Sequence, residues 1–103
     1  MELIETRIFS KQVQEAWSDE EYRAFQLHLV LAPNTGALIP GSGGLRKIRW
    51  GMPGRGKRGG ARVIYYWKSA TGQIFLLFLY PKNVRSDLSP SELRTLRRLI
   101  ADD

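Results

Sequence analysis

The sequence predicts an α+β fold in which an N-terminal strand and one or two helices pack on a curved, mainly antiparallel sheet, followed by a C-terminal helix. Three patterns support this fold: a capped amphipathic helix that begins at Ser18, a β-rich hairpin between Ala61 and Tyr80, and a second capped helix that begins at Ser89. The chain has 103 residues, so we expect residues 1–103 to form a single domain.

The N-terminal part is expected to contain a strand and then helical structure. Leu3 to Phe9 alternates loosely and predicts a first strand, and a short helical turn is expected from Lys11 to Trp17. Ser18 and Glu21 have the spacing of a capping box, which predicts a helix N-terminus. The run Pro33 to Gly36 ends this helix. Its apolar face is expected to consist of Tyr22, Phe25, Leu29 and Ala32.

The middle of the chain is expected to supply three antiparallel strands. Leu45 to Trp50 follows a Gly/Pro-rich connection and predicts the first of them. Gly51 to Gly60 is a loop with five glycines, and Ala61 to Lys68 is rich in β-branched and aromatic residues. Gln73 to Tyr80 completes a hairpin, and its apolar character on both faces indicates a central strand.

The last helix is expected to begin with Ser89 as N-cap, Pro90 at the first helical position and Glu92 at the third. The predicted buried stripe consists of Leu93, Leu96, Leu99 and Ile100. The basic residues Arg94, Arg97 and Arg98 are expected to face solvent.

Charge is distributed unevenly along the chain. The net charge is +6, no Asp or Glu occurs between Glu21 and Asp87, and seven of the sixteen Lys and Arg residues fall between Arg46 and Arg62. A surface with a field of one sign favours a polyanionic partner such as nucleic acid. The bland alternative is a soluble basic protein.

The composition also limits compartment and cofactor. The absence of cysteine excludes disulfides and thiolate metal sites. The N-terminus has no signal-peptide pattern, and the longest apolar run, Ile74 to Tyr80, is too short to cross a bilayer. We therefore expect a cytoplasmic protein without membrane association. The basic middle offers no carboxylates for a metal, and His28 is the only histidine. We expect no metal or other cofactor, and we interpret His28 as structural.

A cluster of cations on neighbouring strands is the strongest candidate for chemistry. Lys47 and Arg49 are two residues apart and project from one face of a strand, whereas Arg46 belongs to the other face. Arg62 opens the neighbouring strand, and Lys82 follows the end of the next. Converging basic side chains bind phosphate, because Arg forms two parallel hydrogen bonds and Lys supplies a point charge.

Such a cluster is chemically sufficient for cleaving RNA. RNA carries its own nucleophile, the 2′-hydroxyl, so cleavage requires positioning, charge stabilisation and proton transfer. A Lys among other cations has a lowered pKa and serves as a base. The alternative is a plain nucleic-acid-binding sheet, with Tyr65, Tyr66 and Trp67 as core or stacking residues.

The segment from Gly51 to Arg58 imitates a nucleotide-binding phosphate loop, but the match fails. Arg58 replaces the Ser or Thr that would ligate magnesium, and a strand follows instead of a helix. The glycines are better explained by close approach of an extended phosphate backbone, and the alternative is a solvated hairpin tip.

Several strings resemble the RelE/HigB toxins of bacterial type II toxin–antitoxin systems, with the HigB branch as the nearest. The resemblance covers nearly the whole chain. It is carried by the segments 18–22, 43–49, 56–66, 80–83 and 86–88, of which the segment from Lys57 to Tyr66 is the most specific.

The resemblance implies a RelE-like fold and a ribosome-dependent endoribonuclease that cleaves mRNA and inhibits translation. It implies a cognate antitoxin as partner, the ribosome and mRNA as target, and operator DNA contacted indirectly through the antitoxin complex. By motif, the implied catalytic residues are Lys47, Arg49, Lys57, Arg62 and Lys82. The implied RNA-binding residues are Arg46, Arg55, Arg58, Asn83 and Arg85.

The chain departs from the RelE pattern at two positions. Asn83 stands where RelE has a further arginine, and Ser89 lies where RelE has its catalytic tyrosine. Our hypothesis is that Lys47 or Lys57 handles the proton. Two other functions remain open: a ParE-like poison of DNA gyrase, and a nucleic-acid-binding module without catalysis.

Overall fold

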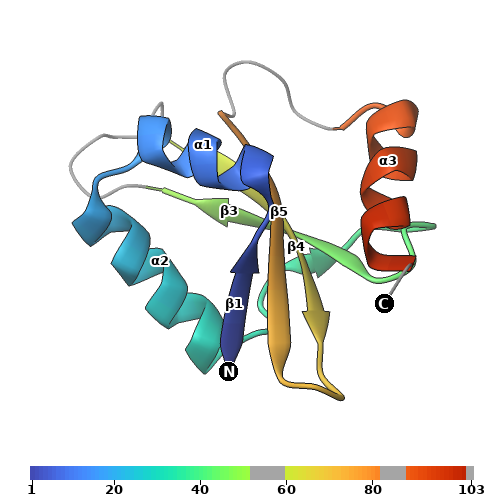
Figure 1. The fold of residues 1–103 in the computed structure, drawn as a ribbon, viewed down its shortest axis with the longest axis horizontal. Coiled ribbons are helices and arrows are strands. Elements are labelled where there is room, and N and C mark those ends of the chain that lie inside the picture. Colours follow the sequence, from blue (N-terminus) through green and yellow to red (C-terminus); the bar gives the residue numbers. More distant parts are fainter. Residues whose placement is uncertain (52–59, 82–87, 102–103) are drawn as a thin grey trace.

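The computed structural model describes residues 1–51, 60–81 and 88–101. Within them, five strands form one sheet in the order β1-β5-β4-β3-β2, and three helices pack on it (Figure 1). The strands are β1 (Glu2–Glu5), β2 (Ala37–Leu38), β3 (Leu45–Trp50), β4 (Ala61–Lys68) and β5 (Gln73–Pro81). The helices are α1 (Arg7–Ala16), α2 (Asp19–Leu31) and α3 (Pro90–Ala101). The predicted α+β fold is confirmed.

The N-terminal strand is shorter than the sequence predicted, because a helix cap ends it. The Thr6 hydroxyl accepts a hydrogen bond from the Phe9 amide at 3.1 Å and donates one to the Leu77 carbonyl at 2.9 Å. Helix α1 therefore begins at Arg7, and the prediction that Ile8 and Phe9 belong to a strand is wrong. Strand β1 pairs with β5 in parallel and forms one edge of the sheet.

The other two helices begin where the sequence predicted. Ser18 and Glu21 form a complete capping box at the start of α2, with reciprocal bonds of 2.7 and 3.1 Å. Ser89 and Glu92 form the same pair at the start of α3, with bonds of 2.9 and 3.2 Å. One detail of the α3 stripe is wrong, because Leu99 is 49% exposed.

Strand β5 contains an irregularity that changes which side chains share a face. It runs antiparallel to β4, and the register shifts so that Tyr65 opposes Leu76 whereas Ile64 opposes Phe78. Leu77 is the additional residue, as in a β-bulge. Beyond this point the alternation is inverted, so Phe78 and Tyr80 face the same side as Phe75.

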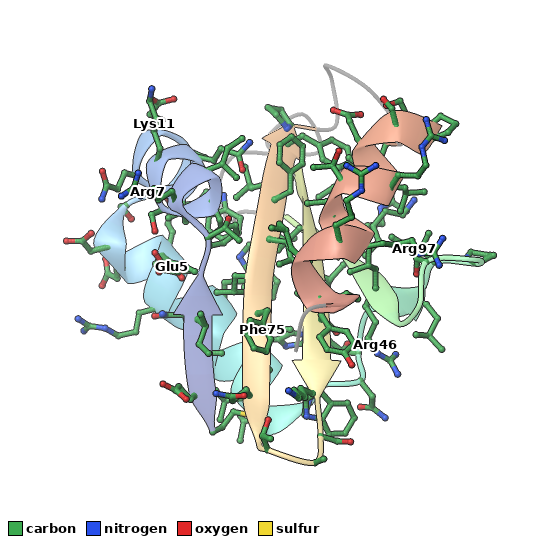
Figure 2. All side chains as sticks on the ribbon, turned by 45° about the vertical axis from the view of Figure 1, so that its right-hand side comes forward. Glu5, Arg7, Lys11, Arg46, Phe75 and Arg97 are labelled. Atoms are coloured by element: carbon green, nitrogen blue, oxygen red, sulfur yellow. The ribbon has the colours of Figure 1, made fainter. Side chains whose placement is uncertain are left out.

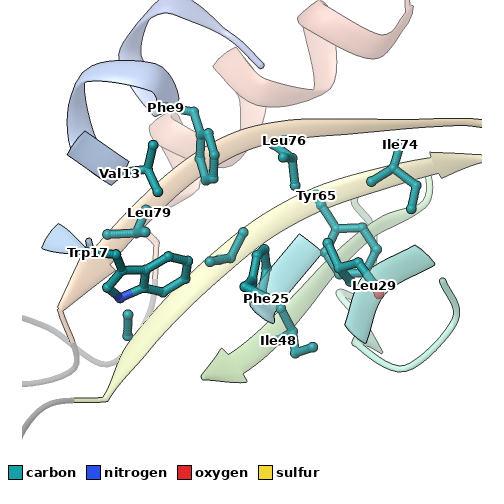
Figure 3. Close-up of a cluster of buried hydrophobic side chains, with 12 residues drawn as sticks. Phe9, Val13, Trp17, Phe25, Leu29, Ile48, Tyr65, Ile74, Leu76 and Leu79 are labelled. Carbon is teal, nitrogen blue, oxygen red and sulfur yellow. The ribbon is translucent and has the colours of Figure 1, made fainter. Parts of the chain in front are cut away.

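The two faces of the sheet carry separate cores, with α1 and α2 on one face and α3 on the other (Figures 1 and 2). The larger core, shown in Figure 3, joins α1 and α2 to the sheet through Phe9, Val13, Trp17, Phe25, Leu29, Ile48, Tyr65, Ile74, Leu76 and Leu79. The smaller core joins α3 to the sheet through Leu45, Ile64, Leu77, Tyr80 and Leu96. Both faces of β5 are therefore covered, which accounts for its continuous apolar run.

Candidate functional site: a cationic row on the α3 face

Three cations predicted from the sequence lie on one face of the sheet, the face that α3 covers in part. Lys47 and Arg49 alternate with Ile48 along β3, and Ile48 belongs to the core on the opposite face. Arg62 alternates with Val63, which also belongs to that opposite core. Arg49 and Arg62 are direct cross-strand partners. Their Cβ atoms therefore lie about 5 Å apart. The Cβ atom of Lys47 lies about 7 Å from that of Arg49, along β3. We call these three residues the cationic row.

Arg62 is the unusual member of the row because it is only 8% exposed. Strands β3, β4 and β5 contain no acidic residue, and no ion pair to Arg62 is found within residues 1–51, 60–81 and 88–101. Arg49, its cross-strand partner, is exposed and carries the same charge. A desolvated cation beside a like charge creates a strong local preference for an anion.

Tyr80 on β5 lies next to the cationic row, and the sequence alone did not point to it. It is the cross-strand partner of Arg62 on the other side of β4, and it is 3% exposed. Strict alternation from the start of β5 would place Tyr80 on the α1–α2 face, but the extra residue Leu77 turns it toward α3. Its ring packs against Phe78, with centroids 6.1 Å apart.

A cavity of about 280 Å³ lies at one end of the row, between the sheet and the start of α3. Its lining consists of Ile39, Lys47, Ile64, Tyr80, Leu88 and Leu93. Ser42 shapes the turn that positions Ile39, since its buried hydroxyl donates to the Ile39 carbonyl and accepts from the Leu45 amide. The cavity therefore combines one cation and one phenol with apolar walls.

Arg46 is separated from the row, although it was predicted to bind RNA. It lies on the α1–α2 side, and its guanidinium donates to the carbonyls of Asn34 at 3.1 Å and Gly36 at 2.8 Å. Tyr65 holds the same loop: its hydroxyl donates to Pro33 O at 2.8 Å and accepts from Gly36 N at 2.9 Å. Burial raises the pKa of Tyr65, and the Gly36 amide and Arg46 oppose that rise. Arg46 thus anchors the loop between α2 and β2.

The remaining predicted site residues lie outside the described part of the chain. They are Arg55, Lys57 and Arg58 after β3, and Lys82, Asn83 and Arg85 after β5. The described ends of both segments border the row: Trp50 follows Arg49, Ala61 precedes Arg62, and Pro81 follows Tyr80.

Across the described ranges, no group of three or more His, Cys, Asp or Glu side chains is arranged to hold a metal ion. No described helix is long and apolar enough to cross a membrane. His28 is exposed on α2, with its ring centroid 5.1 Å from that of Trp50.

The arrangement can bind and polarise a phosphodiester. Arg49 and Arg62 are close enough to share one phosphate group, and a guanidinium fits phosphate with two parallel hydrogen bonds. Fixed cations that face the site where negative charge develops stabilise a pentacovalent transition state.

Comparison with known proteins identifies the family. The family model described as the RelE toxin of the RelE / RelB toxin–antitoxin system matches residues 6–102. The chain belongs to the RelE toxin family. Membership implies a toxin of a toxin–antitoxin system and therefore an antitoxin partner.

A solved structure shows the same fold. This RelE-family toxin superposes on a free double arginine-to-alanine mutant of the E. coli toxin RelE with a TM-score of 0.63. The match covers 94% of this chain and 93% of that chain, and the two sequences are 16% identical. At this level of identity, the likeness concerns the fold alone.

Proposed function

We propose that this RelE-family toxin is a ribosome-dependent endoribonuclease that cleaves mRNA and thereby inhibits translation. The observation that carries the proposal is the cationic row, in which the buried Arg62 and the exposed Arg49 are cross-strand partners with no carboxylate on their strands. Family membership supports the toxin role and an antitoxin partner. The segment from Lys57 to Tyr66 supports the HigB branch within the family, and the span of the family match supports one toxin domain over residues 1–103.

The proposed reaction uses the nucleophile that RNA contains. The 2′-oxygen attacks the adjacent phosphorus, its proton passes to a base, and the bond from phosphorus to the 5′-oxygen breaks. The products are a 2′,3′-cyclic phosphate and a 5′-hydroxyl, which receives a proton from an acid. Arg49 and Arg62 hold the non-bridging oxygens, Lys82 adds positive charge, and Lys47 or Lys57 handles a proton.

RNA contacts outside the reacting phosphate are proposed for the basic residues of the two flanking segments. These are Arg55, Arg58, Asn83 and Arg85. Arg46 is not included, because its guanidinium is engaged with loop carbonyls on the other face of the sheet. An antitoxin that covers the row would block both the phosphate site and access to the ribosome.

The test is induction of the chain in a bacterium without its antitoxin, followed by mapping of mRNA ends. We expect growth arrest and new 5′-hydroxyl ends inside codons, which purified toxin reproduces only when ribosomes are present. Arg62→Met should abolish cleavage, whereas Arg98→Met, on the exposed side of α3, should leave it intact.

Three results would count against the proposal. DNA breaks with intact transcripts would indicate a gyrase poison. Salt-dependent RNA binding without cleavage on ribosomes would indicate a binding module. Full cleavage by the Arg62→Met variant would remove the cationic row from the mechanism.

A further inference from the structure

Helix α2 carries apolar side chains on its outer face as well as on the face that packs against the sheet. Phe25 and Leu29 are buried in the larger core. On the opposite face, Leu27 is 60% exposed, Leu31 is 76% exposed and Val30 is 37% exposed. Within the described residues, these are three of the seven exposed large apolar side chains. We call these three residues the outer stripe, because a helix end that is apolar on all sides is typical of a helix covered on both faces.

The spacing along the outer face is that of two helices packed lengthwise. Four exposed residues follow one another at intervals of four, three and four positions: Glu20, Ala24, Leu27 and Leu31. These intervals keep side chains in one line along a helix, as in paired helices. The apolar members lie in the second half of α2, so a partner helix is expected to be centred near residue 29.

The charges at the two ends of α2 identify the partner helix as a second copy of α2. Residues 19–21, in the first turn, are all acidic. The loop that follows the last turn holds Arg46, whose guanidinium donates to the carbonyls of Asn34 and Gly36. Two antiparallel copies bring each acidic turn toward the Arg46 of the other copy and oppose their helix dipoles favourably. Two parallel copies would instead bring the acidic turns together.

The length of α2 fits the antiparallel arrangement. Its 13 residues span about 20 Å, because each residue adds about 1.5 Å. With a two-fold axis near residue 29, Leu27 of one copy faces Leu31 of the other. Glu20 then lies about 14 Å from the axis, past the last turn of the other α2 and toward the loop that holds Arg46.

Pairing through α2 leaves the cationic row uncovered. Helices α1 and α2 pack on one face of the sheet, whereas the row lies on the face of α3 (Figure 1). The inference therefore does not depend on the proposed function. Pairing of single helices buries less than the roughly 1,200 Å² of a stable interface, so the association is expected to be weak and to depend on protein concentration.

We propose that this chain forms a weak homodimer in which the outer stripe of α2 packs antiparallel against the same stripe of a second copy. The dimer buries the exposed leucines of α2 and pairs each acidic first turn with the Arg46 end of the other helix.

Sedimentation equilibrium of the purified free toxin at rising concentration tests the dimer. We expect a reversible equilibrium between monomer and dimer. Leu27→Lys places a charge in the centre of the stripe, and the fold should tolerate it because Leu27 is exposed. It should raise the dissociation constant of the dimer at least about tenfold, or about 1.4 kcal/mol.

Leu99→Lys is the matched control, because it makes the same substitution at an exposed leucine on α3. We expect Leu99→Lys to dimerise as the wild type does. A wild type that stays monomeric at every concentration, or a Leu27→Lys variant that dimerises with unchanged affinity, would overturn the proposal.

Single cysteines report the direction of the paired helices, because the chain contains no cysteine of its own. A disulfide requires Cα atoms about 4.4–6.8 Å apart. In the antiparallel dimer, Val30→Cys lies beside the axis and should cross-link to its counterpart under mild oxidation. The two copies of Glu20→Cys lie about 27 Å apart and should not cross-link. Equal cross-linking at both positions would indicate parallel helices, and cross-linking at neither would indicate another surface; either result contradicts the proposal.

The antitoxin is the other candidate partner for the outer stripe, since the chain belongs to a toxin–antitoxin family. Co-purification with the antitoxin separates the two occupants. We expect Leu27→Lys to bind the antitoxin as tightly as the wild type does. Loss of antitoxin binding in Leu27→Lys, together with a monomeric wild type, would assign the stripe to the antitoxin and overturn the homodimer.

Discussion

Replacing Arg62 with Met should make the free protein more stable while removing its affinity for phosphate. The Arg62 side chain is only 8% exposed, and no acidic partner for it lies within the described residues. Within that part of the chain, folding therefore desolvates a cation without recovering its hydration through an ion pair. Met has a similar length and no charge, so it can occupy the same space beside Ile64 and Tyr80.

The expected size of the effect follows from the burial. Replacing buried ionic groups with apolar ones of similar volume has stabilised other proteins by about 1–4 kcal/mol. Arg62 retains slight exposure, and we expect a gain of about 1–2 kcal/mol in the free energy of unfolding. For a domain of this size, each kcal/mol raises Tm by about 4–8 °C, so the predicted rise is about 4–16 °C.

Arg46→Met is the matched control, because it makes the same substitution on the neighbouring strand with the opposite expectation. The Arg46 guanidinium donates two hydrogen bonds to the carbonyls of Asn34 and Gly36. Hydrogen bonds from charged groups contribute about 1.5–3 kcal/mol when buried and less when half-buried. We expect Arg46→Met to lower the free energy of unfolding by about 1–3 kcal/mol.

The assay is chemical denaturation of the three proteins in parallel, with and without inorganic phosphate. Phosphate should stabilise the wild type and Arg46→Met, because a ligand that binds only the folded state raises the free energy of unfolding. It should have no effect on Arg62→Met beyond a general salt effect, measured with chloride. A lower stability of Arg62→Met than of the wild type would contradict this prediction, since Arg62 would then have a stabilising partner in the free protein.

Three further predictions concern the scaffold. Tyr65→Phe removes the two hydrogen bonds to the loop between α2 and β2 and should lower the free energy of unfolding by about 1–3 kcal/mol, measured by urea denaturation. An unchanged free energy of unfolding would mean that the loop is held without these two hydrogen bonds. Ser89→Ala removes the α3 cap and should cost about 1 kcal/mol, with faster amide exchange confined to α3; exchange that rises equally in all helices would contradict this. Burial and then the hydrogen bond to Glu5 raise the pKa of Tyr22 above its ordinary value of 10.0, so the unfolded chain ionises first and the protein loses stability as the pH rises above 10. Tyr22→Phe should reduce that loss of stability. An equal slope of unfolding free energy against pH in both proteins would show that Tyr22 keeps an ordinary pKa.

Local signals in the sequence were sufficient for most of the elements. The two capping boxes are contained within four residues each, so Ser18 and Ser89 predicted where α2 and α3 begin. Alternation along β3 predicted that Lys47 and Arg49 share a face and that Arg46 does not. Arg62 opens the next predicted strand along the chain, which the structure pairs with the strand of Arg49. These features depend on spacing along the chain, which the sequence displays directly.

Other features depend on contacts between distant parts of the chain. The Thr6 cap is completed by the Leu77 carbonyl 71 residues away, so the early end of β1 could not be predicted from alternation. The same holds for the parallel pairing of β1 with β5, and for the loop carbonyls that bind Arg46. In each case the partner that decides the local structure is brought close only by the complete fold.

Local spacing in the sequence was sufficient for the caps of α2 and α3, for strands β3, β4 and β5, and for the shared face of Lys47 and Arg49. The strand β2 (Ala37–Leu38) was not predicted, because that stretch was interpreted as a Gly/Pro-rich connection. Tertiary structure alone decided that Arg62 is buried and that Tyr80 joins it. The physical reason is the extra residue Leu77, which inverts the alternation of β5 where it pairs with β4. That inversion turns the phenol away from the core of α1 and α2 and toward the cavity beside Lys47.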